Sequence, residues 1–239
     1  MKILVANPNT STGVTDLLVA AGRLVASPGT DLLPMTAPRG VPYIATRAEA
    51  AIGSAAALEM LAERRGTMDA AIVAAFGDPG LGGARELFDF PLVGMAEAAM
   101  LMACTLGRRF GIVSFSRSLE PWFAEIVDWH GMTGRCAAIR TLDEGFRSIS
   151  EVQHEKEGVL VDLALKTVVD DKADVIILAG ERVPVPLVDG IQAAVVMAEG
   201  LVRLNPRKAT AGTFRRPGPK DSIGLAGPLA DIIAHREKP

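Results

Sequence analysis

The chain has 239 residues, of which 49% are hydrophobic and 22% charged, so it can bury a sizeable core and is not composed like a disordered protein. Its net charge of -3 comes from 25 basic and 28 acidic residues without a long basic run, which argues against a surface that follows a phosphate backbone. We therefore expect a globular protein with no nucleic-acid partner.

We expect no export signal at the start of the chain. Lys2 to Ala6 form a short apolar run that stops at a polar Asn-Pro-Asn turn, and no apolar run reaches the roughly 18 residues needed to span a membrane. We expect a cytoplasmic protein without a membrane partner. In a reducing compartment, Cys104 and Cys136 are expected to be buried free thiols rather than a disulfide.

Apolar runs and helix-forming stretches alternate along the chain. The expected elements are, in order, a strand at 2–6, helices at 14–25 and 47–64, a strand at 69–75, a short helix at 81–87, a strand at 91–93, a helix at 96–105, a strand at 110–114, a helix at 119–129, a strand at 136–140, a helix at 154–169, a strand at 174–179 and a last helix at 225–235. This alternation predicts an α/β fold with parallel sheets covered by helices.

The second part of the chain repeats the first. Residues 91–99 and 186–194 are identical at five of nine positions, and the apolar runs 69–75 and 174–180 precede them in the same order. We expect two pseudo-symmetric half-domains, each a mainly parallel sheet flanked by helices, with the ligand cleft between them. The expected halves are residues 1–98 and 99–204, and the segment 205–239 packs back on the first half or on a neighbouring subunit of a homo-oligomer.

The two copies differ in one connection. Asp69 and Pro91 lie 22 positions apart, whereas Asp174 and Pro186 lie only 12 apart. A parallel crossover usually takes a dozen or more residues, so no crossover helix fits in the second copy. Either residues 186–188 pair in a different way, or a loop is missing between residues 179 and 186.

Four motifs point to one family. The Asn-Pro-Asn-Thr turn at 7–10, Ala-Phe-Gly-Asp-Pro-Gly-Leu at 75–81, Gly-Met-Ala-Glu-Ala at 94–98 and Pro-Leu-Val-Asp-Gly at 186–190 together resemble the aspartate/glutamate/hydantoin racemase family, over roughly residues 1–205. The resemblance implies a cofactor-independent isomerase that moves a proton α to a carbonyl of a small carboxylate or hydantoin-like substrate. In that family each half contributes one cysteine, because inversion needs an acid and a base on opposite faces of the substrate.

The catalytic positions implied by the resemblance hold no thiol. The first cysteine position is Ala75, and the second falls in the region of Ala179, Gly180 and Glu181. Cys104 lies in an expected helix and Cys136 at the start of an expected strand, so neither matches a catalytic position. Activity by the two-thiol route is therefore not supported by these residues.

Polar residues and glycines at the ends of the expected strands are the candidate ligand contacts. They are Asn7, Asn9, Thr10, Phe76, Gly77, Ser114, Ser116 and Asp189. Caps and turns of this kind leave backbone N–H groups free to hold a carboxylate or imide oxygen. The same residues also suit ordinary helix capping and turn formation, and both roles remain open.

Other chemistry finds little support in the sequence. The carboxylates of Asp78 and Glu97 are weak bases for a carbon acid, and His130 has no matched partner. The chain has no metal-binding, dinucleotide or nucleotide motif, so we expect no metal site and no cofactor. Two alternatives to an isomerase remain: a non-catalytic binding or accessory protein on the racemase scaffold, and an inactivated variant in which alanine replaces a cysteine.

Overall fold

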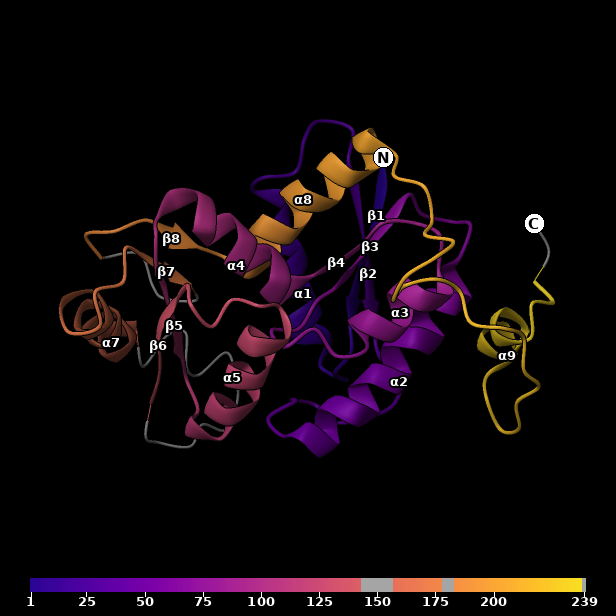
Figure 1. Cartoon of the computed structure of the whole chain (residues 1–239), viewed down its shortest axis with the longest axis horizontal. Helices are drawn as coiled ribbons and strands as arrows, with labels where there is room; N and C mark the ends of the chain where they lie inside the picture. The colour runs from indigo at the N-terminus through magenta and orange to yellow at the C-terminus, as the bar shows by residue number, and fades with distance from the viewer. Residues whose placement is uncertain (143–156, 178–182, 238–239) are drawn as a thin grey trace.

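The computed structural model contains two four-stranded parallel sheets, and it describes residues 1–142, 157–177 and 183–237 (Figure 1). The first sheet has the order β2-β1-β3-β4 and the second β6-β5-β7-β8. The strands are β1 (Lys2–Asn7), β2 (Asp31–Thr36), β3 (Ala70–Val73), β4 (Leu92–Gly94), β5 (Phe110–Ser114), β6 (Cys136–Thr141), β7 (Val175–Ile177) and β8 (Leu187–Val188). The expected α/β fold of two similar sheets is confirmed.

Helices flank both sheets. They are α1 (Thr12–Arg23), α2 (Arg47–Arg64), α3 (Leu81–Leu87), α4 (Met95–Leu106), the 3-10 turn η1 (Arg117–Leu119), α5 (Glu120–Trp129), α7 (Glu157–Val169), α8 (Gly190–Leu204) and α9 (Gly227–Ile233). Local chemistry fixes several starts. At α2, for example, the Thr46 hydroxyl accepts from the Glu49 N–H while the Glu49 carboxylate accepts from the Thr46 N–H, a reciprocal capping box.

The two halves exchange a helix. Helix α4 follows the first sheet in sequence but packs on β5, β7 and β8 of the second, whereas α8 follows the second sheet and packs on α1, β3 and β4 of the first. The two exchanged helices also pack against each other, as Figure 1 shows near the centre of the molecule. Position 98, the expected boundary between the halves, therefore lies inside an exchanged helix. We propose the starts of α4 and α8 as the structural boundaries.

One apolar core joins the halves. Ile3 and Ile72 of the first sheet belong to the same buried cluster as Ile112 and Ile177 of the second, and all four are fully buried. Each such side chain contributes about 1.5–3 kcal/mol by leaving water. The shared cluster holds the two sheets in a fixed relation, which is the condition for a preformed site between them.

The connection between β7 and β8 corrects an expectation. Residues 186–188 do not pair in a different way: β8 lies parallel to β7, with Ile176 opposite Leu187 and Ile177 opposite Val188. The two strands are only three and two residues long, and nine residues, 178 to 186, lie between them in the sequence. The other alternative, a missing loop, falls on residues 178–182, which lie outside the described residues.

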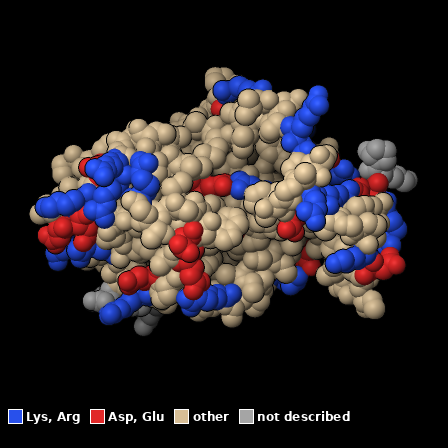
Figure 2. Space-filling model, in the orientation of Figure 1, with Lys and Arg blue, Asp and Glu red and all other residues tan. Residues whose placement is uncertain are grey.

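The C-terminal helix lies on the first half. Helix α9 packs against α2, and Leu229 and Ile232 are buried in a cluster with α2 residues such as Met60 and with Leu92 of β4. No helix in the described part of the chain is long and apolar enough to cross a membrane. On the face in Figure 2, acidic and basic side chains form small mixed groups rather than a field of one sign.

Candidate functional site

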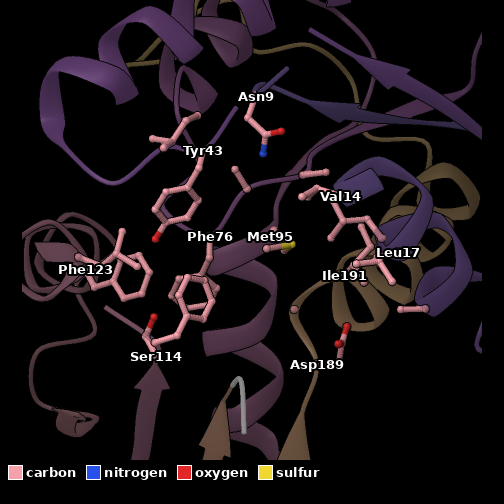
Figure 3. A pocket seen from close by; sticks show the side chains of 18 of the residues that line it. Asn9, Val14, Leu17, Tyr43, Phe76, Met95, Ser114, Phe123, Asp189 and Ile191 are labelled. Carbon is pink, nitrogen blue, oxygen red and sulfur yellow. The ribbon is translucent and has the colours of Figure 1, made fainter. Parts of the chain in front are cut away.

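A cavity of about 230 Å³ lies between the two sheets, beyond the carboxyl ends of β1, β3 and β5 and at the start of α8. Figure 3 shows it from close by. Its walls are formed by Asn9, Val14, Leu17, Leu18, Ala21, Tyr43, Ile44, Ala74, Ala75, Phe76, Met95, Ser114, Phe115, Leu119, Trp122, Phe123, Asp189, Gly190 and Ile191. Carboxyl ends of parallel strands are the usual place for a ligand in α/β proteins.

The cavity wall is mainly apolar. One side is aliphatic and comes from α1, where Val14, Leu17 and Leu18 recur on one helix face. The opposite side is aromatic, with the rings of Phe76 and Phe123 in edge contact at a centroid distance of 4.9 Å. Neither Lys nor Arg is among the lining residues that the structure describes. Such a wall suits a neutral ligand with an apolar substituent.

The turn after β1 presents Asn9 to the cavity. The buried Asn7 amide donates to the side-chain oxygen of Asn9 at 3.0 Å and to the Thr15 hydroxyl at 3.0 Å, and its own oxygen accepts the Asn9 N–H. The Asn7 side chain is thus used within the turn and does not line the cavity. Asn9 points its amide into the space in Figure 3. Thr10 donates its backbone N–H to Val41 and also lies off the cavity wall.

The loop after β3 places Ala75 and Phe76 on the wall. Gly77 follows with φ near +125°, and a Cβ there would lie 2.4 Å from the Trp122 ring, so the glycine lets the ring pack onto the backbone. Gly77 itself does not line the cavity. Ala75, where the sequence motifs led us to expect the first cysteine position, brings only a methyl group to the wall.

Asp78, the next residue in this loop, has a structural role. Its carboxylate accepts the backbone N–H groups of Ala96 and Glu97, each at 2.8 Å, and so caps α4, whose own N-cap is Gly94. Burial raises the pKa of the Asp78 carboxyl, while the hydrogen bonds from His130 and from the helix oppose that shift. Its side chain does not line the cavity.

Ser114, the last residue of β5, brings an unused hydroxyl to the cavity. The residue is 2% exposed, and its Oγ has no hydrogen-bond partner in the described part of the chain. A buried hydroxyl without a partner costs about 1–3 kcal/mol, so its retention in a cavity wall points to a ligand contact. Ser116 differs, because its hydroxyl bonds that of Ser118 at 2.8 Å and lies off the wall.

Asp189 lies at the rim, where α8 begins. Its carboxylate accepts the Gln192 N–H at 2.9 Å as a helix N-cap, and the residue is exposed while also lining the cavity. Capping and ligand contact therefore coexist at this position. The region expected to hold the second cysteine position, Ala179, Gly180 and Glu181, lies outside the described residues.

The two cysteines of the chain are away from the cavity. Cys104, in the last turn of α4, directs its thiol to the Met132 sulfur at 3.9 Å. Burial raises the pKa of the Cys136 thiol to about 11, which keeps it protonated at neutral pH. Neither residue is in a position to exchange a proton with a ligand in the cavity.

Several residues that line the cavity were not predicted from the sequence. Tyr43 lies in a long connection, while Trp122 and Phe123 lie on α5, and their apolar character is equally typical of core packing. The α1 residues repeat at helical spacing, which indicates a buried face but not what faces it. Among the described residues there is no group of three or more His, Cys, Asp or Glu side chains that could hold a metal ion.

Comparisons with known proteins agree with this geometry. A family model described as Asp/Glu/Hydantoin racemase matches residues 3–198. The chain is 32% identical to a hydantoin racemase of Paenarthrobacter aurescens, over 93% of this chain and 100% of that protein.

Two solved structures are similar in both sequence and fold. The allantoin racemase of Klebsiella pneumoniae has a TM-score of 0.87 at 31% identity, covering 96% of this chain and 98% of that one. The allantoin racemase of Pseudomonas fluorescens has a TM-score of 0.86 at 31% identity, covering 94% of this chain and 100% of that one. These matches confirm the resemblance carried by the sequence motifs: the chain belongs to the Asp/Glu/hydantoin racemase family.

Proposed function

We propose that the cavity binds a neutral five-membered cyclic ureide of the hydantoin type. The observation that carries the proposal is the buried Ser114 hydroxyl, which has no partner among the described residues and faces the cavity beside an apolar wall. A hydantoin ring offers N–H donors and carbonyl acceptors that pair with this hydroxyl and with the Asn9 amide across the cavity. The names of the similar proteins, hydantoin and allantoin racemase, support the same ligand class.

A free dicarboxylate fits the described wall less well. Two carboxylates entering an apolar cavity lose hydration, and that cost is recovered only when cations or several N–H groups receive them. No Lys or Arg is among the described lining residues, and the one charged residue, Asp189, is itself an acid. The charge balance therefore favours a neutral ring over aspartate or glutamate.

An isomerase activity on the same ligand is the second candidate. It is favoured by the full-length similarity to a hydantoin racemase, and the reaction would invert the carbon α to a ring carbonyl by removing and returning its proton. The two-thiol version of that reaction has no thiol at position 75 and none among residues 178–182. We therefore place binding first, and we treat turnover as a separate question with its own measurement.

Calorimetry with hydantoin carrying an isobutyl group tests the binding proposal. We expect saturable binding to the wild-type chain, and an affinity about five- to tenfold lower in Ser114→Ala, the effect of one lost hydrogen bond. Ser116→Ala is the matched control, because its hydroxyl lies off the wall, and it should bind like the wild type. Equal binding by the wild type and Ser114→Ala would remove Ser114 from the proposal, and no binding at millimolar ligand would end it.

Turnover is followed separately by proton exchange in heavy water. The wild-type chain is incubated with one enantiomer of the same hydantoin, and deuterium at the α carbon and optical rotation are recorded against a protein-free blank. Exchange and inversion above the blank would establish the isomerase. Binding without either would establish a binding protein on the racemase scaffold.

A further inference from the structure

A second pocket lies on the first half, where the chain that follows α8 passes the connection between α3 and β4. We call it the outer pocket. It has a volume of about 240 Å³ and is lined by Arg85, Phe88, Asp89, Phe90, Pro91, Leu92, Leu201, Pro206, Arg207, Lys208, Ala209 and Phe214. None of these residues lines the cavity between the sheets, so the outer pocket is separate from the ligand site proposed above.

The end of α8 directs the chain into this position. Asn205 closes α8 in the left-handed conformation, with φ near +48°, and the next residue, Pro206, cannot continue a helix. The chain then passes α3 on its way to α9, as Figure 1 shows. Lys208 fastens it there, because its Nζ donates to the backbone carbonyl of Arg85 on α3.

Part of the pocket wall is aromatic. Phe88 is buried in the core of the first half, and the centre of its ring lies 5.2 Å from that of Phe90. The third ring, Phe214, comes from the segment after α8, and the Arg85 guanidinium carbon lies 5.9 Å from its centre. Three phenyl rings in one small pocket offer a large apolar contact area to a flat ligand.

The pocket wall also carries an excess of positive charge. Its charged residues are one acid, Asp89, and three cations, Arg85, Arg207 and Lys208. An anion should therefore be attracted to this wall more strongly than a cation.

Two of the four charges already have a partner outside the pocket wall. The Arg85 guanidinium donates to both carboxylate oxygens of Glu97, and Asp89 forms an ion pair with Arg65 at 3.5 Å. These pairs leave Arg207 and Lys208 as the charges that a ligand would meet.

Neither Arg207 nor Lys208 has an ion pair with a carboxylate in the part of the chain that the structure describes. Burial lowers the pKa of the Lys208 ammonium; the acids Asp89 and Glu86 oppose this shift, and Arg216 adds to it. The carbonyl contact uses one of the three N–H groups of the ammonium. A partly buried ammonium of this kind is stabilised by an anion that accepts its other N–H groups.

We propose that the outer pocket binds a small aromatic carboxylate. The carboxylate pairs with Lys208 and Arg207, and the ring lies against the three phenyl rings of the wall. Pockets for drug-sized ligands measure about 300–1,000 Å³, so a pocket of about 240 Å³ suits a single ring with a short acidic arm.

Two simpler ligands satisfy only half of this wall. An inorganic anion pairs with the cations and leaves the phenyl rings without contact. A neutral aromatic molecule contacts the rings and leaves Arg207 and Lys208 without a counter-charge. The two halves of the ligand can therefore be tested one at a time.

Calorimetry with phenylacetate tests the proposal. We expect saturable binding to the wild-type chain in the millimolar range, as is usual for a ligand of this size. Acetate lacks the ring and 2-phenylethanol lacks the charge, so each should bind about tenfold more weakly or less. Binding of either one as tightly as phenylacetate, or no binding of phenylacetate at millimolar concentration, would overturn the proposal.

Variants of the two cations test where phenylacetate binds. Lys208→Met should weaken binding about tenfold, because it removes the charge and keeps an unbranched side chain. Lys220→Met is the matched control: it makes the same change at an exposed residue of the same C-terminal segment, off the pocket wall, and should bind like the wild type.

Arg207→Gln changes an exposed residue, so it leaves the fold intact, and it should weaken binding about threefold. Wild-type affinity in Lys208→Met would overturn the proposal. If Lys208→Met fails to fold, Arg207→Gln takes its place, and wild-type affinity in that variant would overturn the proposal.

Competition separates the outer pocket from the cavity between the sheets, which also has an aromatic wall. Phenylacetate should bind with the same affinity when the chain is saturated with the isobutyl-substituted hydantoin. Displacement of phenylacetate by the hydantoin would place both ligands in the cavity between the sheets and overturn the outer pocket. If the hydantoin does not bind, the proposed function fails, and the Lys208 and Arg207 variants still decide the outer pocket.

Discussion

The carboxylate of Asp78 occupies the space that a side chain on Gly94 would need: a Cβ built on Gly94 would lie 2.4 Å from the Asp78 carboxyl carbon. The two residues belong to the loop after β3 and to the end of β4, and the carboxylate reaches past Gly94 to the first N–H groups of α4. The glycine is therefore required by its neighbour, although its own backbone conformation, with φ near -86°, is open to any residue.

Gly94→Ala should destabilise the fold by about 1–3 kcal/mol, because the added methyl group must displace the buried carboxylate and weaken the cap of α4. Urea unfolding followed by circular dichroism measures the loss. Gly200→Ala is the control, since that glycine is an exposed position of helix α8 with open space around its Cβ, and the variant should be neutral or gain up to about 1 kcal/mol. Equal stability of the two variants would show that Asp78 can move without cost.

Gly77→Ala combines backbone strain with a clash. The φ of +125° disfavours any side chain, and the Trp122 ring would lie 2.4 Å from the new Cβ, so we expect a loss of about 2 kcal/mol or more. Because Trp122 lines the cavity, hydantoin affinity should fall as well. Gly29→Ala separates the two causes, since Gly29 has φ of +83° with nothing within 4 Å of its Cβ. It should lose stability through strain alone and keep its affinity.

Glu199 on α8 fastens the loop between α1 and β2. Its buried carboxylate accepts the Ser27 N–H at 2.8 Å, the Ser27 hydroxyl at 2.5 Å and the Thr30 hydroxyl at 2.6 Å, and Arg203 lies at 2.9 Å. Burial acts to raise the pKa of Glu199, but these donors together with Arg203 outweigh it and hold the pKa below its ordinary value. The ionised form is therefore favoured by folding.

Glu199→Gln should lower stability at neutral pH by about 2 kcal/mol, the range for hydrogen bonds to a charged group. The contribution of an acid with a lowered pKa is present above its unfolded pKa, near 4.5, and is lost as pH falls through the folded value. The stability difference between wild type and variant should therefore shrink below about pH 4.5. Glu63→Gln, on an exposed acid of α2, is the control and should change stability by less than about 0.5 kcal/mol at any pH. A difference that grows on acidification would contradict the assignment.

Local signals in the sequence were sufficient for most helices and inner strands. The bounds expected for 47–64, 81–87 and 110–114 match α2, α3 and β5, because strong helix formers or continuous buried runs with clear stops define them. Strand β2 was missed, since Pro34 interrupts its apolar pattern, and a proline is tolerated there because β2 lies at the edge of its sheet. Strand β2 forms by pairing with β1. The residues of β2 alone do not indicate this pairing, because the partner strand lies elsewhere in the sequence.

The site was predictable only in part. Motif residues at strand ends brought Asn9, Phe76 and Ser114 to one cavity, as the expected cleft requires. The turn motif alone did not show that the Asn7 side-chain amide hydrogen-bonds within the turn. This bond forms because the folded chain places the Thr15 hydroxyl within reach of the amide. The aromatic wall from α5 and the exchange of α4 and α8 arise from packing between the halves, which periodicity within one segment does not report.

Ala75→Cys tests whether the cavity supports proton exchange when position 75 carries a thiol. The new thiol would stand on the cavity wall at one face of the proposed hydantoin, with no second thiol opposite. A single base can remove and return a proton on its own face, so we expect deuterium to enter one enantiomer in heavy water much faster than that enantiomer inverts. Proton magnetic resonance records the exchange, and optical rotation records the inversion.

Ala75→Ser is the control and should stay at the level of the wild type, because a hydroxyl is a far weaker base than a thiolate. Equal rates of exchange and inversion in Ala75→Cys would reveal a second acid on the opposite face, and the search for it would start at Asp189, the charged residue at the rim.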